Sequence, residues 1–318
     1  MAACARLAAR GRTLAHPNPS VAALLVQKDD GQERVIGRGW TQIGGRPHAE
    51  AMALAGLNGG SAKDATLYVT LEPCAHKSNR GPACSDLIVE ARPARVVVGC
   101  FDPDPRTYRK GVARIEKAEI PVTVLEDGAS RDSLAGYLSR AQKGRPYITL
   151  KLATSLDGCI ATVSGESQWI TGEAARAHVH SQRAHQDAIL VGGGTWRSDQ
   201  PRLDVRLDGL AERSPKRLLL SRGVAPDDVR VLDRPDQVHE LTDTQYLYVE
   251  GGAGAAASFL AEDLVDELHL YRAPILIGSG QHAIGDIGLG SLSDAHGRWT
   301  LKARRQLGSD VFESYLRT

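Results

Sequence analysis

Short apolar runs that alternate with helical stretches are the feature that most constrains how this chain can fold. In the first part of the chain, runs rich in Val, Ile, Leu and Tyr predict strands at residues 21–26, 66–71, 95–100 and 122–125. The stretches between them predict helices at residues 3–10, 48–57, 84–91 and 110–118. Alternation of this kind indicates α/β layering around a mostly parallel or mixed sheet.

A polar, helical connector at residues 128–144 separates this pattern from a second one. Further strands are predicted at residues 147–152, 188–191, 217–220, 246–249, 268–271 and 311–315. The segment 206–245 is expected to form mainly surface loops around one clear strand. Because 318 residues suffice for two ordinary domains, we predict domains at residues 1–144 and 145–318.

Composition narrows the classes of partner and compartment. Lys plus Arg number 39 against 38 Asp plus Glu, and this balance argues against DNA or RNA as the main partner. No apolar run approaches the roughly 20 residues that span a bilayer, so no membrane partner is expected. The five cysteines are an odd, widely spaced set, which suits a reducing cytoplasm rather than a disulfide framework.

One histidine, two cysteines and a glutamate have the pattern of a catalytic zinc site. His48 and Glu50 open a predicted helix, Cys74 follows a predicted strand, and Cys84 begins another helix. One imidazole and two thiolates suit Zn²⁺ and leave a fourth position for water, whose pKa the metal lowers. Glu50 can move protons beside that water, as in enzymes that deaminate a ring carbon. The alternatives are a structural zinc, closed by His76, or two unrelated buried cysteines, but a structural site would not require Glu50.

Two glycine-rich turns follow predicted strands in the second half. Gly192-Gly193-Gly194-Thr195 comes after one strand, and Gly251-Gly252-Ala253-Gly254 comes after another. Such turns bring backbone N–H groups close to a phosphate. Together they favour a nucleotide-binding second domain.

Several ordered motifs resemble one enzyme family, the bifunctional riboflavin-biosynthesis deaminase–reductases. The first-half motifs are His16-Pro17-Asn18-Pro19, Pro47-His48-Ala49-Glu50, Thr70-Leu71-Glu72-Pro73-Cys74-Ala75-His76 and Asp102-Pro103-Asp104-Pro105. The second-half motifs lie at residues 150–158, 164–171, 188–195 and 249–252. The resemblance implies a cytidine-deaminase-like three-layer domain followed by a dihydrofolate-reductase-like α/β domain.

The same resemblance implies the reactions, cofactors and assembly. A zinc-dependent step would deaminate 2,5-diamino-6-ribosylamino-4(3H)-pyrimidinone 5′-phosphate, and NADPH would then reduce the ribosyl chain to ribityl. The implied cofactors are therefore Zn²⁺ and NADPH, the implied partner is a small pyrimidine ribotide, and the implied assembly is a homodimer.

Site residues follow from the resemblance position by position. In the first half, Asn18, His76 and Arg80 would bind substrate. Substrate contacts in the second half would come from Ser167, Arg183, Leu203, Arg206 and Glu250. NADPH contacts would come from Ala153, Trp169, Thr195, Asp199, Gly252, Ala253, Gly254, Ala255, Ala256, Ala257 and Ser258. Lys151 and Asp199 would assist the proton that must reach the sugar oxygen.

Alternatives remain for several of these residues. Asn18 could shape a turn, Lys151 could be a surface lysine, and Trp169 could be a core aromatic. Three histidines (His178, His180 and His185) are interpreted as solvated helix residues rather than a second metal site.

Two departures from the family pattern affect parts of the sites, and the shorter region after Arg206 motivates the second of two rival functions. Nine residues separate Cys74 from Cys84, one more than is commonest in the family, and the region after Arg206 is shorter than usual. One rival is a deaminase of a nucleoside or RNA with a C-terminal recognition domain. The other treats the C-terminal half as an assembly module without reductase activity.

Overall fold

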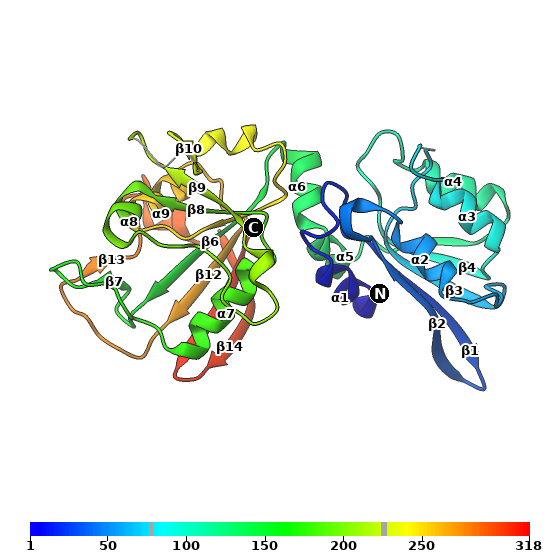
Figure 1. Ribbon diagram of the computed structural model, residues 1–318, viewed down its shortest axis with the longest axis horizontal. Coiled ribbons are helices and arrows are strands. Elements are labelled where there is room, and N and C mark those ends of the chain that lie inside the picture. Colours follow the sequence, from blue (N-terminus) through cyan, green and yellow to red (C-terminus); the bar gives the residue numbers. More distant parts are fainter. Residues whose placement is uncertain (77–78, 224–227) are drawn as a thin grey trace. The chain divides into compact units, whose positions relative to one another are not determined.

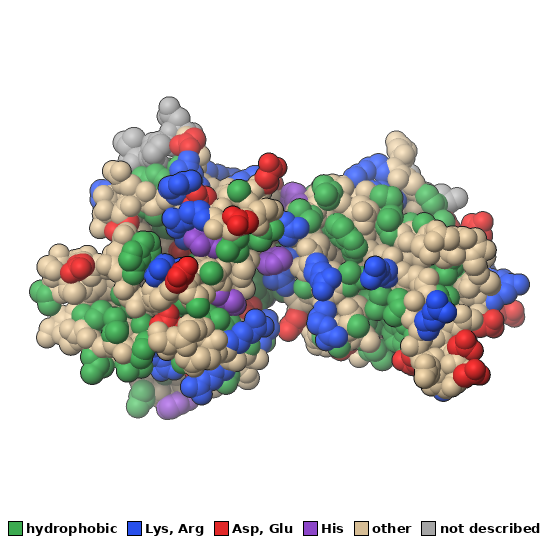
Figure 2. Space-filling view, turned by 60° about the horizontal axis from the view of Figure 1, so that its bottom comes forward, with side chains coloured by type: hydrophobic (Ala, Val, Ile, Leu, Met, Phe, Trp, Pro, Cys, Tyr) green, Lys and Arg blue, Asp and Glu red, His purple; other side chains and the backbone are tan. Residues whose placement is uncertain are grey.

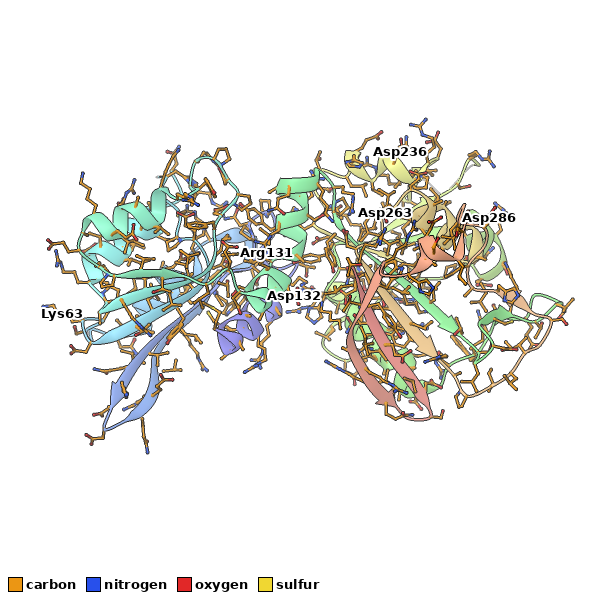
Figure 3. The ribbon with its side chains drawn as sticks, turned by 180° about the vertical axis from the view of Figure 1, so that it is seen from behind. Lys63, Arg131, Asp132, Asp236, Asp263 and Asp286 are labelled. Atoms are coloured by element: carbon orange, nitrogen blue, oxygen red, sulfur yellow. The ribbon has the colours of Figure 1, made fainter. Side chains whose placement is uncertain are left out.

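The computed structural model describes residues 1–76, 79–223 and 228–318. The chain divides into two compact units, Met1–Gly144 and Arg145–Thr318 (Figure 1). Within the described residues, no helix has the length and apolar character needed to cross a membrane. Acidic and basic side chains are interspersed over the face shown in Figure 2, and charged side chains such as Lys63 and Asp286 are exposed (Figure 3).

A five-stranded mixed sheet organises the first unit. Its order is β2-β1-β3-β4-β5, formed by Gln32–Trp40, Ala22–Asp29, Ala65–Leu71, Arg95–Cys100 and Val122–Val124. β1 is antiparallel to β2 and β3, whereas β3, β4 and β5 are parallel. The valine- and leucine-rich β3 and β4 are the buried centre of this sheet, as expected for strands covered on both faces.

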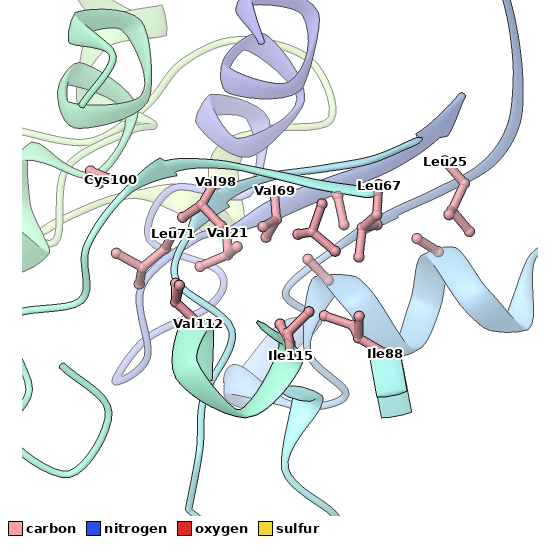
Figure 4. Close-up of a cluster of buried hydrophobic side chains, with 14 of the residues drawn as sticks. Val21, Leu25, Leu67, Val69, Leu71, Ile88, Val98, Cys100, Val112 and Ile115 are labelled. Carbon is pink, nitrogen blue, oxygen red and sulfur yellow. The ribbon is translucent and has the colours of Figure 1, made fainter. Parts of the chain in front are cut away.

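Helices cover both faces of this sheet and give a three-layer α/β unit. α2 (Ala49–Ala55), α3 (Cys84–Ala91) and α4 (Lys110–Lys117) pack on one face, where Ile88 and Ile115 meet Leu67 and Val69 (Figure 4). On the other face, α1 (Ala2–Arg10) places Cys4 against Ala22. α5 (Gly128–Ser133) packs against α1 and β4, and α6 (Ala135–Lys143) ends the unit.

An eight-stranded sheet organises the second unit. Its order is β10-β9-β8-β11-β6-β12-β15-β14, formed by Arg230–Leu232, Lys216–Leu220, Ala188–Gly192, Tyr246–Val249, Tyr147–Thr154, Glu267–Arg272, Asp310–Arg317 and Trp299–Leu307. The first six strands are parallel, and β15 is antiparallel to both of its neighbours, β12 and β14. A separate two-stranded antiparallel sheet pairs β13 (Gln281–His282) with β7 (Cys159–Ala161), which are far apart in sequence.

Among the described residues of the second unit, three α-helices connect strands. α7 (Glu173–Arg183) packs Ala175 and Val179 on one sheet face, where they join Tyr248 and Phe312. α9 (Ala253–Ala261) packs Ala256 and Phe259 on the opposite face. α8 (Gly193–Asp199) follows β8 directly. The carboxyl ends of the parallel strands β6, β8 and β11 therefore lie between these helices, at the edge where open α/β sheets bind ligands.

The structure corrects two expectations. The segment 206–245 holds β10 beside β9 in addition to the expected strand. His178 and His180 are not solvated, because α7 packs them against the sheet: His180 is buried, and His178 Nδ1 lies 2.8 Å from the Tyr271 hydroxyl. Burial, with nearby Arg305, lowers the pKa of His178 to about 4. His185 lies beyond the end of α7, so it shares no helix face with His178.

Candidate functional sites

Three elements of the first unit bring a histidine and two cysteines together. His48 is the N-cap of α2, and Cys84 is the first residue of α3. Cys74 follows the end of β3, three residues beyond Leu71. The carboxyl end of β3 and the first residues of α2 and α3 meet at one edge of the sheet. These three residues, which are distant in sequence, therefore become neighbours.

The ligand atoms of this cluster lie within 4.8 Å of one another. His48 Nδ1 is 3.3 Å from Cys84 Sγ and 3.6 Å from Cys74 Sγ. A hydrogen bond from the Cys84 thiol, together with the His48 imidazole and the Cys84 backbone N–H, lowers the pKa of Cys74. The same hydrogen bond to Cys74, together with burial, raises the pKa of Cys84. One imidazole nitrogen and two cysteine sulfurs are a suitable donor set for Zn²⁺. His76 is not part of this cluster, and its Nδ1 contacts Thr107 Oγ1 at 3.3 Å.

Glu50 lies in the first turn of α2 beside the three ligand atoms. Its side chain is buried, at 3% exposure. Burial raises the pKa of Glu50 to about 6, against the opposing charge of His48. A carboxyl group with this environment can hold a proton near neutral pH and release it, which is the requirement for a general acid–base.

Asn18 contacts the far side of the His48 ring. Its side-chain nitrogen donates to the Gly45 carbonyl at 2.8 Å and lies 3.2 Å from His48 Nε2. Gly45 has a φ of +88°, and an added Cβ would come within 2.7 Å of Asn18 Cγ. Arg80, whose Nη2 donates to the Gly44 carbonyl at 2.7 Å, is exposed. The structure thus brings Asn18 next to the cluster and Arg80 next to the neighbouring turn.

A cavity of about 720 Å³ opens at the carboxyl ends of β6, β8 and β11 in the second unit. Most residues predicted for the reductase half line this cavity: Lys151, Ala153, Ser167, Trp169, Arg183, Thr195, Asp199, Leu203, Arg206, Glu250, Gly252, Ala253, Gly254 and Ala255. Ala256, Ala257 and Ser258 lie further along α9 and outside the lining, and Ala256 is fully buried in the core.

A buried charge cluster forms the polar floor of the cavity. Arg183 binds Glu250 through two hydrogen bonds of 2.7 and 3.0 Å, and Lys151 Nζ lies 3.7 Å from the same carboxylate. Although burial opposes it, the charges of Arg183 and Lys151 lower the pKa of Glu250 to about 2. The Lys151 side chain is 17% exposed, so it is not a surface lysine.

The glycine-rich turns form another wall of the cavity, where the absence of side chains leaves the backbone accessible to a ligand. A Cβ added at Gly194 or Gly254 would meet nothing within 4 Å. The Gly252 N–H donates to Thr195 Oγ1 at 3.2 Å, which joins the two glycine-rich turns. Backbone N–H groups at the start of α9 are a suitable cradle for phosphate, and this wall fits a nucleotide cofactor.

His180 and Arg176 are among the lining residues that the sequence did not single out as site residues. His180 Nδ1 lies 3.1 Å from the Asp204 carbonyl oxygen, which also accepts from Arg183. The Arg176 guanidinium stacks 4.7 Å from the Trp169 ring centre, and Trp169 is 65% exposed rather than a core aromatic. His180 and Arg176 lie three and seven residues before Arg183, on its face of α7, so a helix prediction for residues 173–183 could have found them.

Comparison with known proteins assigns both units. Residues 1–100 match the family model of the cytidine and deoxycytidylate deaminase zinc-binding region, and residues 146–312 match that of the RibD C-terminal domain. The riboflavin biosynthesis protein RibD of Escherichia coli is 37% identical, over 98% of this chain and 96% of its own length. This chain belongs to the RibD family. RibD of Mycobacterium tuberculosis is 36% identical, over 94% and 91% of the two chains.

Solved structures of the RibD family agree with this assignment. A Thermotoga maritima structure, described as a diaminohydroxyphosphoribosylaminopyrimidine deaminase/5-amino-6-(5-phosphoribosylamino)uracil reductase, has a TM-score of 0.86 at 29% identity and covers 99% of this chain. Acinetobacter baumannii RibD has a TM-score of 0.83 at 33% identity, also over 99% of this chain. Both cover 97% of the solved chain.

Family membership confirms the main sequence predictions. The fold is a cytidine-deaminase-like domain followed by a RibD reductase domain of dihydrofolate-reductase-like fold. The chain is a bifunctional deaminase and reductase of riboflavin biosynthesis that uses Zn²⁺ and NADPH. A nucleoside or RNA deaminase with a C-terminal recognition or assembly module is not favoured, because the reductase family model matches the second unit.

Proposed function

We propose that residues 1–144 deaminate 2,5-diamino-6-ribosylamino-4(3H)-pyrimidinone 5′-phosphate and that residues 145–318 reduce the ribosyl chain of the product to ribityl. The observation that carries the first half is the cluster of His48, Cys74 and Cys84 with buried Glu50 beside it. The second half is supported by the glycine-lined cavity with Lys151 and Asp199 in its wall.

In the first unit, His48, Cys74 and Cys84 hold the metal. Zinc, when bound there, supplies a Lewis acid that makes water more acidic. Glu50 takes the proton of the attacking water and delivers it to the departing amino nitrogen. Its position beside the cluster suits this role. Asn18 and His76 bind the pyrimidine side of the site, and Arg80 binds the substrate phosphate.

NADPH, when bound in the second unit, would supply the hydride. The glycine-rich turns would hold its phosphates, and Trp169 and Thr195 would be further contacts. Lys151 and Asp199 provide the proton for the sugar oxygen. The buried Arg183–Glu250 pair orients the substrate, with Ser167, Leu203 and Arg206 as further contacts.

The direct test supplies the pyrimidine ribotide to the purified full-length chain. Ammonia release and then NADPH oxidation are expected, each in stoichiometric amount. Oxidation of NADPH without prior ammonia release would contradict the proposed order.

We further propose that the chain is cytoplasmic, in keeping with its five free, buried thiols, and that it forms a homodimer. Light scattering on the eluted protein should give twice the chain mass of 34.1 kDa, and a monomeric mass would refute the dimer.

A further inference from the structure

Helix α4 contacts both of the segments that carry the cysteines of the cluster. Gly111 in its first turn is so close to Pro73, which directly precedes Cys74, that an added Cβ would lie 1.9 Å from the Pro73 carbonyl oxygen. The neighbouring Ser85, directly after Cys84, donates from its hydroxyl to the Cys74 carbonyl at 3.0 Å. The two cysteine segments are therefore bound to each other and pressed against α4.

Two side chains connect α4 to these segments by hydrogen bonds, and Glu72 forms the larger number of them. It is 3% exposed, and its carboxylate accepts backbone N–H groups of Arg109, Gly111 and Val112 at 3.0–3.1 Å. The N-cap residue of α4 supplies no side-chain cap of its own. Glu72 satisfies the N–H groups that a helix start leaves unpaired, and it does so from two residues before Cys74.

Arg114 is the second connecting side chain, and it lies one turn further along α4. Its Nη1 donates to Asp86 Oδ1 at 2.8 Å and to Ser85 Oγ at 3.2 Å. Both acceptors lie in the first turn of α3, directly after Cys84. One helix thus holds the Cys74 segment through Glu72 and the Cys84 segment through Arg114.

We propose that Glu72 and Arg114 are positioning residues of the deaminase site, which set the separation of the Cys74 and Cys84 sulfurs through α4. This inference rests on the proposed zinc site. Residues that orient metal ligands typically change metal affinity or activity by about 10–100-fold when removed. Glu72, with three short hydrogen bonds, is expected to have the larger effect, and Arg114 the smaller.

The test compares full-length Glu72→Ala, Glu72→Gln, Gly111→Ala and Arg114→Met chains with a matched control, Asp127→Ala. Asp127 caps α5 by accepting from Ser130 N–H at 2.9 Å, so its loss removes a helix cap in the same unit but not beside the cluster. Zinc affinity is measured by competition with a chromophoric chelator. kcat and KM are measured for ammonia release, and NADPH oxidation on the deaminated ribotide reports the folding of the second unit.

Glu72→Ala is expected to weaken zinc binding by about tenfold or more and to lower kcat more than KM changes. Glu72→Gln retains one acceptor oxygen and should fall between Glu72→Ala and wild type, while Asp127→Ala should bind zinc as the wild type does. Glu72 variants that bind zinc as tightly as Asp127→Ala overturn the inference. If Glu72→Ala does not fold, Glu72→Gln and Arg114→Met decide by the same criterion. A wild-type chain that neither binds zinc nor releases ammonia overturns the proposed function as well.

Discussion

The buried pair between Arg183 and Glu250 supports a quantitative prediction for Glu250→Gln. Both side chains are about one-tenth exposed, with Glu250 at 9% and Arg183 at 11%. The amide of the variant retains one acceptor but no charge, so Arg183 and Lys151 remain buried without a counter-ion. Removing one partner of such a pair typically costs about 3–5 kcal/mol.

The pKa of Glu250 gives a similar magnitude. A tenfold change in acidity is worth about 1.4 kcal/mol, so lowering the pKa from 4.5 to about 2 corresponds to roughly 3 kcal/mol. A loss of this size should lower the Tm of a domain of this length by roughly 6–12 °C. Urea unfolding of the second unit, followed by tryptophan fluorescence at pH 7, measures the difference in free energy of unfolding.

The pH dependence of this difference has a definite sign. Because the pKa of Glu250 is lower in the folded chain, its ionic contribution is complete above the ordinary carboxyl value and is lost as pH falls toward 2. The wild type should therefore exceed Glu250→Gln by a constant amount at pH 6–8, and by less below about pH 4.5. The exposed pair of Lys216 and Asp243 provides the control, since Asp243→Asn should cost less than about 1 kcal/mol. A Glu250→Gln chain within 1 kcal/mol of wild type at pH 7 would mean that this ion pair does not stabilise the second unit.

Three further predictions concern the two sites. Glu50→Gln should retain zinc but slow ammonia release by about 10²–10⁴-fold, as measured by metal analysis and a coupled ammonia assay. Gly251→Val should raise the KM for NADPH severalfold, because even a Cβ there would lie 2.6 Å from Ala255 Cβ and displace the start of α9. Removal of zinc by a chelator should stop ammonia release while NADPH oxidation on the deaminated ribotide continues.

Each of these predictions has a contrary outcome. Near-wild-type ammonia release by Glu50→Gln would remove Glu50 from proton transfer. An unchanged KM for NADPH in Gly251→Val, measured on a chain with normal ammonia release, would place the cofactor away from α9. Equal loss of both activities on chelation would mean that the metal supports the whole fold rather than the deaminase site.

The sequence predicted buried strands better than exposed ones. β4 and β11 were predicted with the bounds they have, because their apolar runs are buried. β2 and β14 were missed, because both lie at sheet edges, where more than half of their residues are exposed and three in each strand are charged. Their strand conformation depends on pairing with β1 and β15, which no local pattern in β2 or β14 reports.

The metal cluster was predictable, whereas the reductase site was predictable only in part. His48, Cys74 and Cys84 have side chains whose chemistry identifies them, and each lies at the end of a predictable element. Arg183 and Glu250 are 67 positions apart, and only the packing of α7 onto the sheet brings them together. His180 was misread for the same reason, since its burial depends on that packing.

The most direct test of the account is one measurement on the purified wild-type chain: zinc content together with ammonia and NADPH traces on the pyrimidine ribotide. The account predicts one zinc per chain, ammonia release first, and one NADPH oxidised per ammonia released. A chain that carries one zinc and releases ammonia but leaves NADPH unchanged would contradict the assignment of the second unit, and a zinc-free chain that still releases ammonia would contradict the first.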